Sequence, residues 1–347
     1  MTDSLGHHGC LLFLILETVL LFVLVTAINV YVSGFNDYDL VLFKSSLHGV
    51  LAKFPVDVTP PDWVFILWAA TWLYLFIWMM YSITLLFRKP GDGKGYLYFR
   101  PPFVPLSVYI SFNLSLLAQI GWIFLWTLEE LRWSALTLLA VIVFAIVTMI
   151  LAIRGLHFYA DDLHRLRNGA DVRGDHVIVQ NSLGMYVAGT TMLTIINLAV
   201  ALVYEWNMDQ VDATTVALST MGGVILIYFI LDIVVFTADM CCLLAPYVVF
   251  TVVASGIMTK SFSGGDRNFL IALFLIGLAG FTTLFKLASM LYHACKKDHE
   301  EDEAKKKLLS NTSDDEDGSF DEDEDLQSND KETKKYIKQA QLLLKAK

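Results

Sequence analysis

Charged residues are scarce in most of this 347-residue chain. Lys, Arg, Asp and Glu make up 17% of the sequence, but residues 296–347 hold 11 of the 25 basic and 16 of the 35 acidic residues. The first 295 residues are therefore about one-ninth charged, against about a quarter in soluble domains. Because 56% of the chain is hydrophobic and its mean hydropathy is +0.56, this scarcity excludes a soluble globular protein.

The chain also lacks the sequence signatures of common enzymes and of disulfide-stabilised proteins. It contains no Gly-rich phosphate loop and no HExxH, GxSxG or CxxC motif. Four Cys residues are present, all at the ends of expected helices: Cys10, Cys241, Cys242 and Cys295. We therefore expect no enzyme and no disulfide framework.

Metal and nucleic-acid sites are not indicated either. His157, Asp161 and His164 have a spacing that metal ligands use, but no further ligand accompanies them, and an exposed helix end explains them better. The net charge of −10 divides equally between residues 1–295 and 296–347, so no basic surface is predicted. We expect no metal, no required cofactor and no nucleic-acid partner.

Long apolar segments dominate residues 1–295. A hydrocarbon core of about 30 Å is crossed by about 20 mostly apolar residues in a helix. Eight segments meet this requirement: 11–32, 63–87, 104–126, 134–154, 183–205, 215–237, 240–259 and 269–294. The sequence predicts an all-α, polytopic transmembrane bundle of about eight spans, with the lipid bilayer as its partner.

The distribution of Lys and Arg predicts the orientation of this bundle. Eight of these residues lie in or beside the loops 88–103 and 155–182, whereas the loops on the opposite side hold five. The positive-inside rule then places both termini in the cytosol of a plasma membrane or endomembrane protein.

Two of the expected spans carry aromatic and polar side chains at helical spacing. The stripe on segment 63–87 is wholly aromatic: Phe65, Trp68, Trp72 and Phe76. The stripe on segment 104–126 adds polar groups: Ser115, Gln119, Trp122 and Trp126. Since lipid offers polar groups no hydrogen bonds, these faces should point inward and could form a pocket for a flat apolar ligand. Interhelical packing with interfacial Trp residues is the alternative interpretation.

Three ionisable residues fall inside the expected spans: Glu17, Asp232 and Lys286. Each lies about 9–12 Å from the predicted cytosolic end of its helix, at 1.5 Å per residue. Such residues are costly in a membrane unless they pair. We expect an intramembrane charge cluster, which would serve either as a structural ion pair between the first and last helices or as a proton or ion site.

Short motifs in residues 55–255 resemble the TspO/MBR translocator and tryptophan-rich sensory protein family. The segment before and within the second span matches the family's T-P-A-G-(Y/W)-x-F-S-I-W motif at Thr59, Pro60, Trp63, Phe65 and Trp68. A second block, YVAGTTMLTIIN, is similar at Tyr186, Thr191, Thr194 and Asn197, with Gly189 in place of a Trp. Shorter similarities lie at Asn113 with Trp122 and at Pro246 with Tyr247.

The resemblance implies a helical bundle that encloses a pocket for porphyrins, sterols or similar flat hydrophobic molecules. Short family members have five helices, so this chain would be an enlarged relative with an inserted pair and one added C-terminal helix. Together with the polar and aromatic faces, it predicts these ligand-binding residues: Phe65, Trp68, Trp72, Asn113, Gln119, Trp122, Asn197 and Tyr247.

Residues 296–347 are predicted to form a disordered, acidic cytosolic tail. The stretch SNTSDDEDGSFDEDEDLQSND is nearly devoid of apolar residues, and Ser313 and Ser319 precede acidic runs as acidophilic kinase sites do. A kinase or another cytosolic partner could therefore act on the tail.

The sequence alone is compatible with three functions. The first is a membrane protein that binds a flat hydrophobic small molecule, porphyrin- or sterol-like, as a sensor or carrier. The second is an ion- or proton-coupled transporter or channel that uses Glu17, Asp232 and Lys286. The third is a receptor-like or scaffold protein that signals through its tail.

Overall fold

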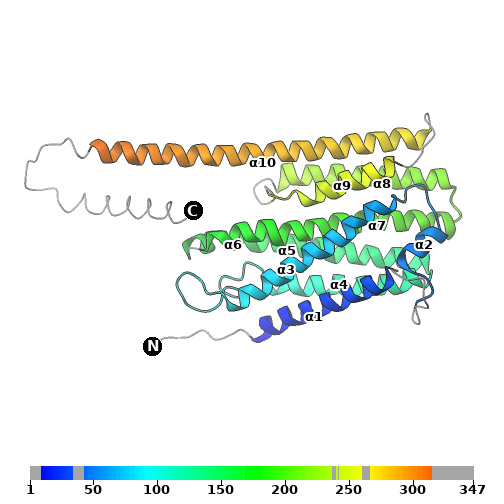
Figure 1. Ribbon diagram of the computed structural model, residues 1–347, viewed down its shortest axis with the longest axis horizontal. Helices are drawn as coiled ribbons and strands as arrows, with labels where there is room; N and C mark the ends of the chain where they lie inside the picture. The colour runs from blue at the N-terminus through cyan, green and yellow to red at the C-terminus, as the bar shows by residue number, and fades with distance from the viewer. Residues whose placement is uncertain are drawn as a thin grey trace, which may run out of the picture. The chain divides into compact units, whose positions relative to one another are not determined.

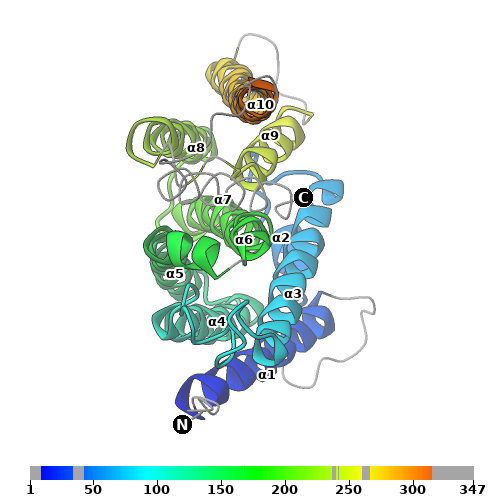
Figure 2. The ribbon, with the colours of Figure 1, turned by 90° about the vertical axis from the view of Figure 1, so that its left-hand side faces the viewer.

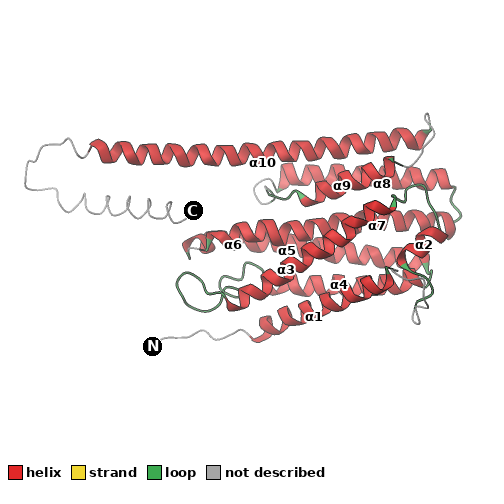
Figure 3. Ribbon diagram, in the orientation of Figure 1, coloured by secondary structure: helices red, strands yellow, loops and turns green. Residues whose placement is uncertain are grey.

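The computed structural model describes residues 9–33, 43–166, 168–236, 240, 242–259 and 266–314, with side chains described up to residue 293. These residues form helices and loops and contain no strand (Figure 1, Figure 3). The helices are α1 (Gly9–Val32), α2 (Leu47–Lys53), η1 (Asp62–Phe65), α3 (Ile66–Phe87), α4 (Leu106–Thr127), α5 (Leu131–Arg165), α6 (Gly169–Gly174), the π-helical η2 (Asp175–Gln180), α7 (Asn181–Tyr204), α8 (Gln210–Ile230), the π-helical η3 (Leu231–Val235), α9 (Ala245–Met258) and α10 (Arg267–Asp314). The predicted all-α class is confirmed.

Seven of the described helical segments are long and apolar enough to cross a membrane. They correspond to every predicted span except 240–259, which contains α9 instead. This helix has 14 residues, or about 21 Å at 1.5 Å per residue, and is shorter than a full span. Pro246 lies in the first turn of α9. A proline fits this position because the N–H groups of the first turn have no partner within the helix, and it therefore marks the late start of α9.

Helix α7 is the central helix of the bundle. It packs against α3, α5, α8 and α9, as the end-on view in Figure 2 shows. In the most apolar stretch of the segment that contains α7, 67% of the residues are buried, against 22% in the segment of α8. The outer helices present large apolar side chains on their free faces, including Leu20, Phe87 and Phe274, as expected for contact with lipid.

A close backbone contact positions α9 against the start of α3. A Cβ atom added to Gly256 would lie 2.3 Å from Val64 Cγ2, so only glycine allows α9 to pack this tightly on η1. The amide of Asn181 fixes the other end of α9, where its Oδ1 accepts hydrogen bonds from the backbone N–H groups of Leu244 and Ala245, both at 3.0 Å.

The chain divides into two units, residues 1–286 and 287–347, and the helices α1–α9 belong to the first. In the second unit the backbone of α10 continues to Asp314, so helix extends into the first part of the segment 296–347 that the sequence predicts to be largely disordered. The segment 296–309 is rich in Ala, Glu, Leu and Lys, which favour helix, and its sequence has Glu301 and Lys305 at i, i+4 spacing, which favours helix further. The predicted disorder and kinase site around Ser319 lie outside the described residues.

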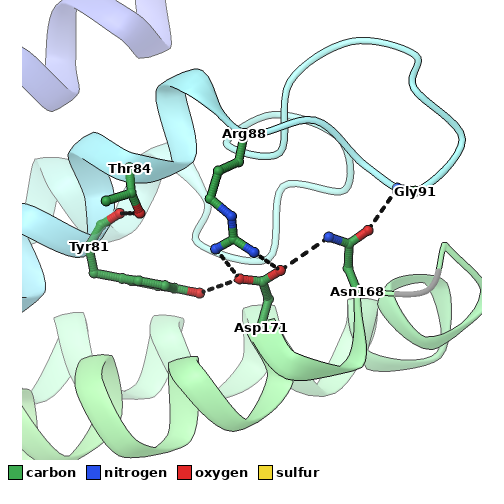
Figure 4. A network of polar contacts seen from close by, with 6 residues as sticks. All are labelled: Tyr81, Thr84, Arg88, Gly91, Asn168 and Asp171. Atoms are coloured by element: carbon green, nitrogen blue, oxygen red, sulfur yellow. Dashed lines mark hydrogen bonds and ion pairs between the residues drawn. The ribbon is translucent and has the colours of Figure 1, made fainter. Parts of the chain in front are cut away.

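A polar network fastens the loop after α3 to the helix α6 (Figure 4). The Arg88 guanidinium donates to both carboxylate oxygens of Asp171, at 2.6 and 2.8 Å. Tyr81 and Asn168 donate to the same carboxylate at 3.1 and 3.2 Å, and the Gly91 N–H donates to Asn168 Oδ1 at 2.9 Å. Asp171 is 2% exposed, so its charge is compensated by a full set of donors.

Candidate functional site: an aromatic cavity

A cavity of about 650 Å³ lies among six helical elements of the bundle. Its volume is within the range of about 300–1,000 Å³ that small-molecule sites occupy. The walls come from α1, α2, η1 with α3, α4, α7 and α9. Among the lining residues are Phe22, Asn29, Phe65, Trp68, Trp72, Phe76, Trp122, Trp126, Gly189, Asn197 and Val253.

Aromatic rings cover two facing walls of this cavity. The whole predicted stripe of α3, from Phe65 to Phe76, lines it, because residues spaced by three or four positions share one helix face. The ring centroids of Trp68 and Trp72 are 6.2 Å apart in an edge-to-face arrangement, and those of Trp122 and Trp126 are 6.4 Å apart and nearly parallel. Flat apolar surfaces of this kind suit the faces of a flat apolar ligand.

Three residues that line the cavity each carry a buried hydrogen-bond donor that has no acceptor among the described residues. The donors are Nε1 of Trp72 on α3, Nε1 of Trp122 on α4 and Nδ2 of Asn197 on α7, and all three residues are buried. Ser134 donates to Asn197 Oδ1 at 3.1 Å, which orients the amide and leaves Nδ2 unpaired. A buried donor without a partner costs about 1–3 kcal/mol. Each of the three donor atoms is closed to a water-sized molecule, so an acceptor in the cavity would reach it only after the side chain turns.

A comparison against known protein families agrees with this bundle of membrane-spanning helices. The family model described as TSPO-like protein matches residues 14–285, which is more than half of the chain. The chain belongs to the TSPO-like protein family. Neither a curated protein nor a solved structure matches it. This TSPO-like chain is accordingly a multi-pass membrane protein, and the predicted resemblance is confirmed.

Five of the eight residues predicted to bind a ligand line the cavity of the TSPO-like chain: Phe65, Trp68, Trp72, Trp122 and Asn197. Their contact with a ligand stays a prediction. The other three are not on the wall. Asn113 donates through Nδ2 to Glu17 Oε2 at 3.1 Å, and Tyr247 donates to Asp232 Oδ2 at 2.6 Å. Gln119 is fully buried on α4, and neither of its amide atoms has a partner among the described residues.

The predicted intramembrane charge cluster forms with two of its three members. Lys286 Nζ donates to Asp232 Oδ1 at 2.8 Å and to the Met240 carbonyl oxygen at 2.7 Å. Both Asp232 and Lys286 are buried, at 2% and 6% exposed, and Tyr247 supplies the second donor to Asp232. Glu17 makes no ion pair among the described residues; it faces Asn113 on α4 because α1 packs against α4 and α3. The prediction that Glu17 joins the cluster was therefore wrong.

A short helix that the sequence did not predict forms one rim of the cavity. Helix α2 contributes Leu47, His48 and Leu51 to the lining. The Trp126 indole donates to the Leu47 carbonyl oxygen at 3.2 Å, which ties α2 to α4. Its only local signal is Ser46, whose side chain accepts from the Gly49 N–H and caps the helix.

Glu129, in the turn between α4 and α5, holds the segment that carries α2. Lys44 and Lys53 donate to its Oε2 at 2.7 and 2.6 Å, and Ser45 donates to Oε1 at 3.0 Å. These hydrogen bonds, from Lys44 first, lower the pKa of the Glu129 carboxyl to about 2. Glu129 has a φ of +66°, a conformation that a residue with a side chain adopts only when its surroundings hold it there.

Asn29 on α1, like Glu129, is a residue of the cavity region that the sequence did not single out. Its Oδ1 accepts from Trp68 Nε1 at 3.5 Å, and its Nδ2 donates to the Val25 carbonyl oxygen at 3.0 Å. A buried amide in an otherwise apolar segment was the available signal, because such a group needs protein partners inside a membrane. The segment around His157, Asp161 and His164 holds exposed side chains, and no metal-binding group is present among the described residues.

Proposed function

We propose that this TSPO-like membrane protein binds a flat, largely apolar small molecule in the aromatic cavity and acts as its sensor or carrier. The observation that carries the proposal is the apolar cavity of about 650 Å³, whose aromatic lining comes from α3 and α4 and whose polar lining includes Asn197 of α7. An apolar site with a few placed polar groups is the usual composition of a ligand pocket.

The donors favour some ligands over others. Each donor meets a ligand only when its side chain turns toward the cavity, and a ligand with several acceptor atoms, such as the carboxylates of a porphyrin, would then satisfy more than one of the three donors. A sterol with one hydroxyl group can accept from one donor and leaves the others unpaired. Porphyrin-like molecules are therefore the first class to test, and sterol-like molecules the second.

The test is a titration of the purified full chain with protoporphyrin, followed by quenching of tryptophan fluorescence. Saturable quenching is expected. Trp68→Ala and Trp122→Ala should each weaken binding by about tenfold or more, since truncating an aromatic anchor costs about 2 kcal/mol. Trp72→Phe keeps a ring but removes the N–H and should weaken binding about two- to tenfold, from about 0.5–1.5 kcal/mol per hydrogen bond.

Trp78→Phe is the matched control. Trp78 is on α3, is fully buried and also has an unpaired Nε1, but it is not on the cavity wall. Its replacement should leave the porphyrin affinity unchanged. Absence of saturable quenching, or equal losses in Trp78→Phe and Trp72→Phe, would contradict the proposal.

We propose that both termini face the cytosol, which the excess of Lys and Arg around loops 88–103 and 155–182 supports. The transporter hypothesis loses its three-residue site, because Glu17 pairs with Asn113. The scaffold hypothesis depends on a tail whose residues 315–347 lie outside the described part of the chain.

A further inference from the structure

Two buried carboxylates lie one helical turn apart where α6 leads into α7. Asp171 is 2% exposed and Asp175 is completely buried. Both belong to short elements that precede α7, and neither lines the aromatic cavity. Their surroundings differ in one respect that decides the protonation of each group, namely the hydrogen-bond donors around them.

Asp171 has the surroundings of an ionised carboxylate. Arg88 binds it through two parallel N–H donors, and Tyr81 and Asn168 add one donor each (Figure 4). Four donors, two of them from a cation, satisfy both oxygens and compensate the charge.

Asp175 has no such surroundings. Its Oδ2 accepts from the neutral amide of Gln180 at 3.1 Å, and its Oδ1 has no partner among the described residues. No ion pair forms to Asp175 within this part of the chain, and both guanidinium nitrogens of Arg88 that donate to a carboxylate are bound to Asp171. The π-helical geometry of η2 places Gln180 over Asp175 at i, i+5 spacing and so supplies this single donor.

The titratable groups around Asp175 supply no compensating charge. Tyr81 on α3 and Tyr109 on α4 are neutral phenols within electrostatic range of it. On η2 itself, His176 contacts Gln180 Oε1 through Nδ1 at 3.0 Å and so lies on the far side of the amide. Helix α7 has no charged residue between 181 and 204. The charged side chains of α5 from Arg154 to Arg165 are exposed, and so is Arg173 on α6.

We propose that Asp175 holds a proton in the folded protein and is a proton-binding site at the start of α7. An isolated carboxylate that is cut off from water loses its hydration without a substitute, so the neutral acid is the stable form. Ionisation would also place a second negative charge one turn from Asp171. The neutral acid carries no charge to desolvate, and its carbonyl oxygen keeps the hydrogen bond from Gln180.

Infrared spectroscopy of the full chain at neutral pH tests the proposal, with Asp171→Asn as the matched control. The carbonyl stretch of a neutral carboxylic acid is separate from the bands of carboxylates. We expect Asp175→Asn to remove one neutral-acid band that Asp171→Asn retains. Loss of carboxylate absorption in Asp175→Asn, with the neutral-acid region unchanged, would overturn the proposal.

Thermal unfolding as a function of pH gives a second, independent readout. At neutral pH Asp175→Asn should melt above the wild type, because Asn is neutral without binding a proton, whereas folding of the wild type must return a proton that the unfolded chain has released. Asp171→Asn should melt well below the wild type. From mildly acidic to mildly alkaline pH, the wild type should lose stability relative to Asp175→Asn, because over this range the folded state still binds the proton that the unfolded chain has released. A variant Asp175→Asn that melts as low as Asp171→Asn, or does not fold at neutral pH, would show that the charge is required and overturn the proposal.

Discussion

Replacing Lys286 by Met would leave the Asp232 carboxylate buried without its cation. The two groups are 2.8 Å apart and at most 6% exposed, so water cannot replace the lost ammonium group. Breaking a buried pair by removing one partner costs about 3–5 kcal/mol. We expect Lys286→Met, and separately Asp232→Asn, to lower the free energy of unfolding by amounts in this range.

The double variant should recover much of this loss. Asn at position 232 can still accept from Tyr247, and Met at position 286 fills the space of the Lys stem, so only the Met240 carbonyl oxygen loses its donor. An orphaned acceptor of this kind costs about 1–3 kcal/mol. The coupling energy between the two sites should therefore be at least about 2 kcal/mol, measured by equilibrium denaturation in detergent micelles.

The exposed pair of Arg267 and Asp212 provides the matched control for this cycle. Its N···O distance is 2.6 Å, but both side chains are more than half exposed, and exposed pairs couple by about 1 kcal/mol or less. If Lys286→Met and Asp232→Asn were additive within about 0.5 kcal/mol, the two residues would not act as a buried pair and the reasoning would be refuted.

Three further predictions concern the cavity and its rim. Glu129→Gln should remove the stability that the low pKa of Glu129 supplies. This contribution is fully present above pH 4.5, the usual pKa of Glu, and is lost as the pH falls toward about 2. The melting temperatures of wild type and variant should therefore converge below pH 4.5. Gly256→Val should lower the free energy of unfolding by about 1–3 kcal/mol, because the new side chain would collide with Val64. Gly223→Ala, where the added atom has open space, should not lower it. Equal effects of the two variants in denaturation would contradict the close packing of α9 on η1. Trp72→Phe should weaken porphyrin binding without changing the melting temperature, and a loss of stability instead would show a packing role.

The sequence predicted the spans and the aromatic stripe because both depend on short-range regularities. Runs of apolar residues set the helices, and the spacing from Phe65 to Phe76 set one face of α3, which lines the cavity as a unit. The spacing carries no information on which helix lies opposite. For this reason the partners of Trp68 emerge only from the structure. The segment 240–259 was expected to contribute Tyr247, and the structure shows that α9 contributes Val249 and Val253 to the wall instead.

The errors in the predicted sites have the same origin. Glu17, Asp232 and Lys286 were grouped by their depth along three helices, but contact also depends on the rotation and neighbours of each helix, and α1 packs on α4. The π-helical segments η2 and η3 shift the helical register, so the surroundings of Asp175 and Asp232 do not follow from a 3.6-residue period. Helix α2 has seven residues and too few apolar positions for a periodic signal.

Gly189 allows the most direct test of ligand binding in the cavity. Gly189 is on the wall, and a Cβ atom added there would lie 3.9 Å from Thr71 Oγ1 and 4.0 Å from Trp68 Cζ3, so a side chain at this position has room to extend into the cavity. Protoporphyrin titration should give one saturable site per chain in the wild type and at least a tenfold loss of affinity in Gly189→Phe with an unchanged melting temperature. Equal affinity of the wild type and a stably folded Gly189→Phe would contradict binding in this cavity.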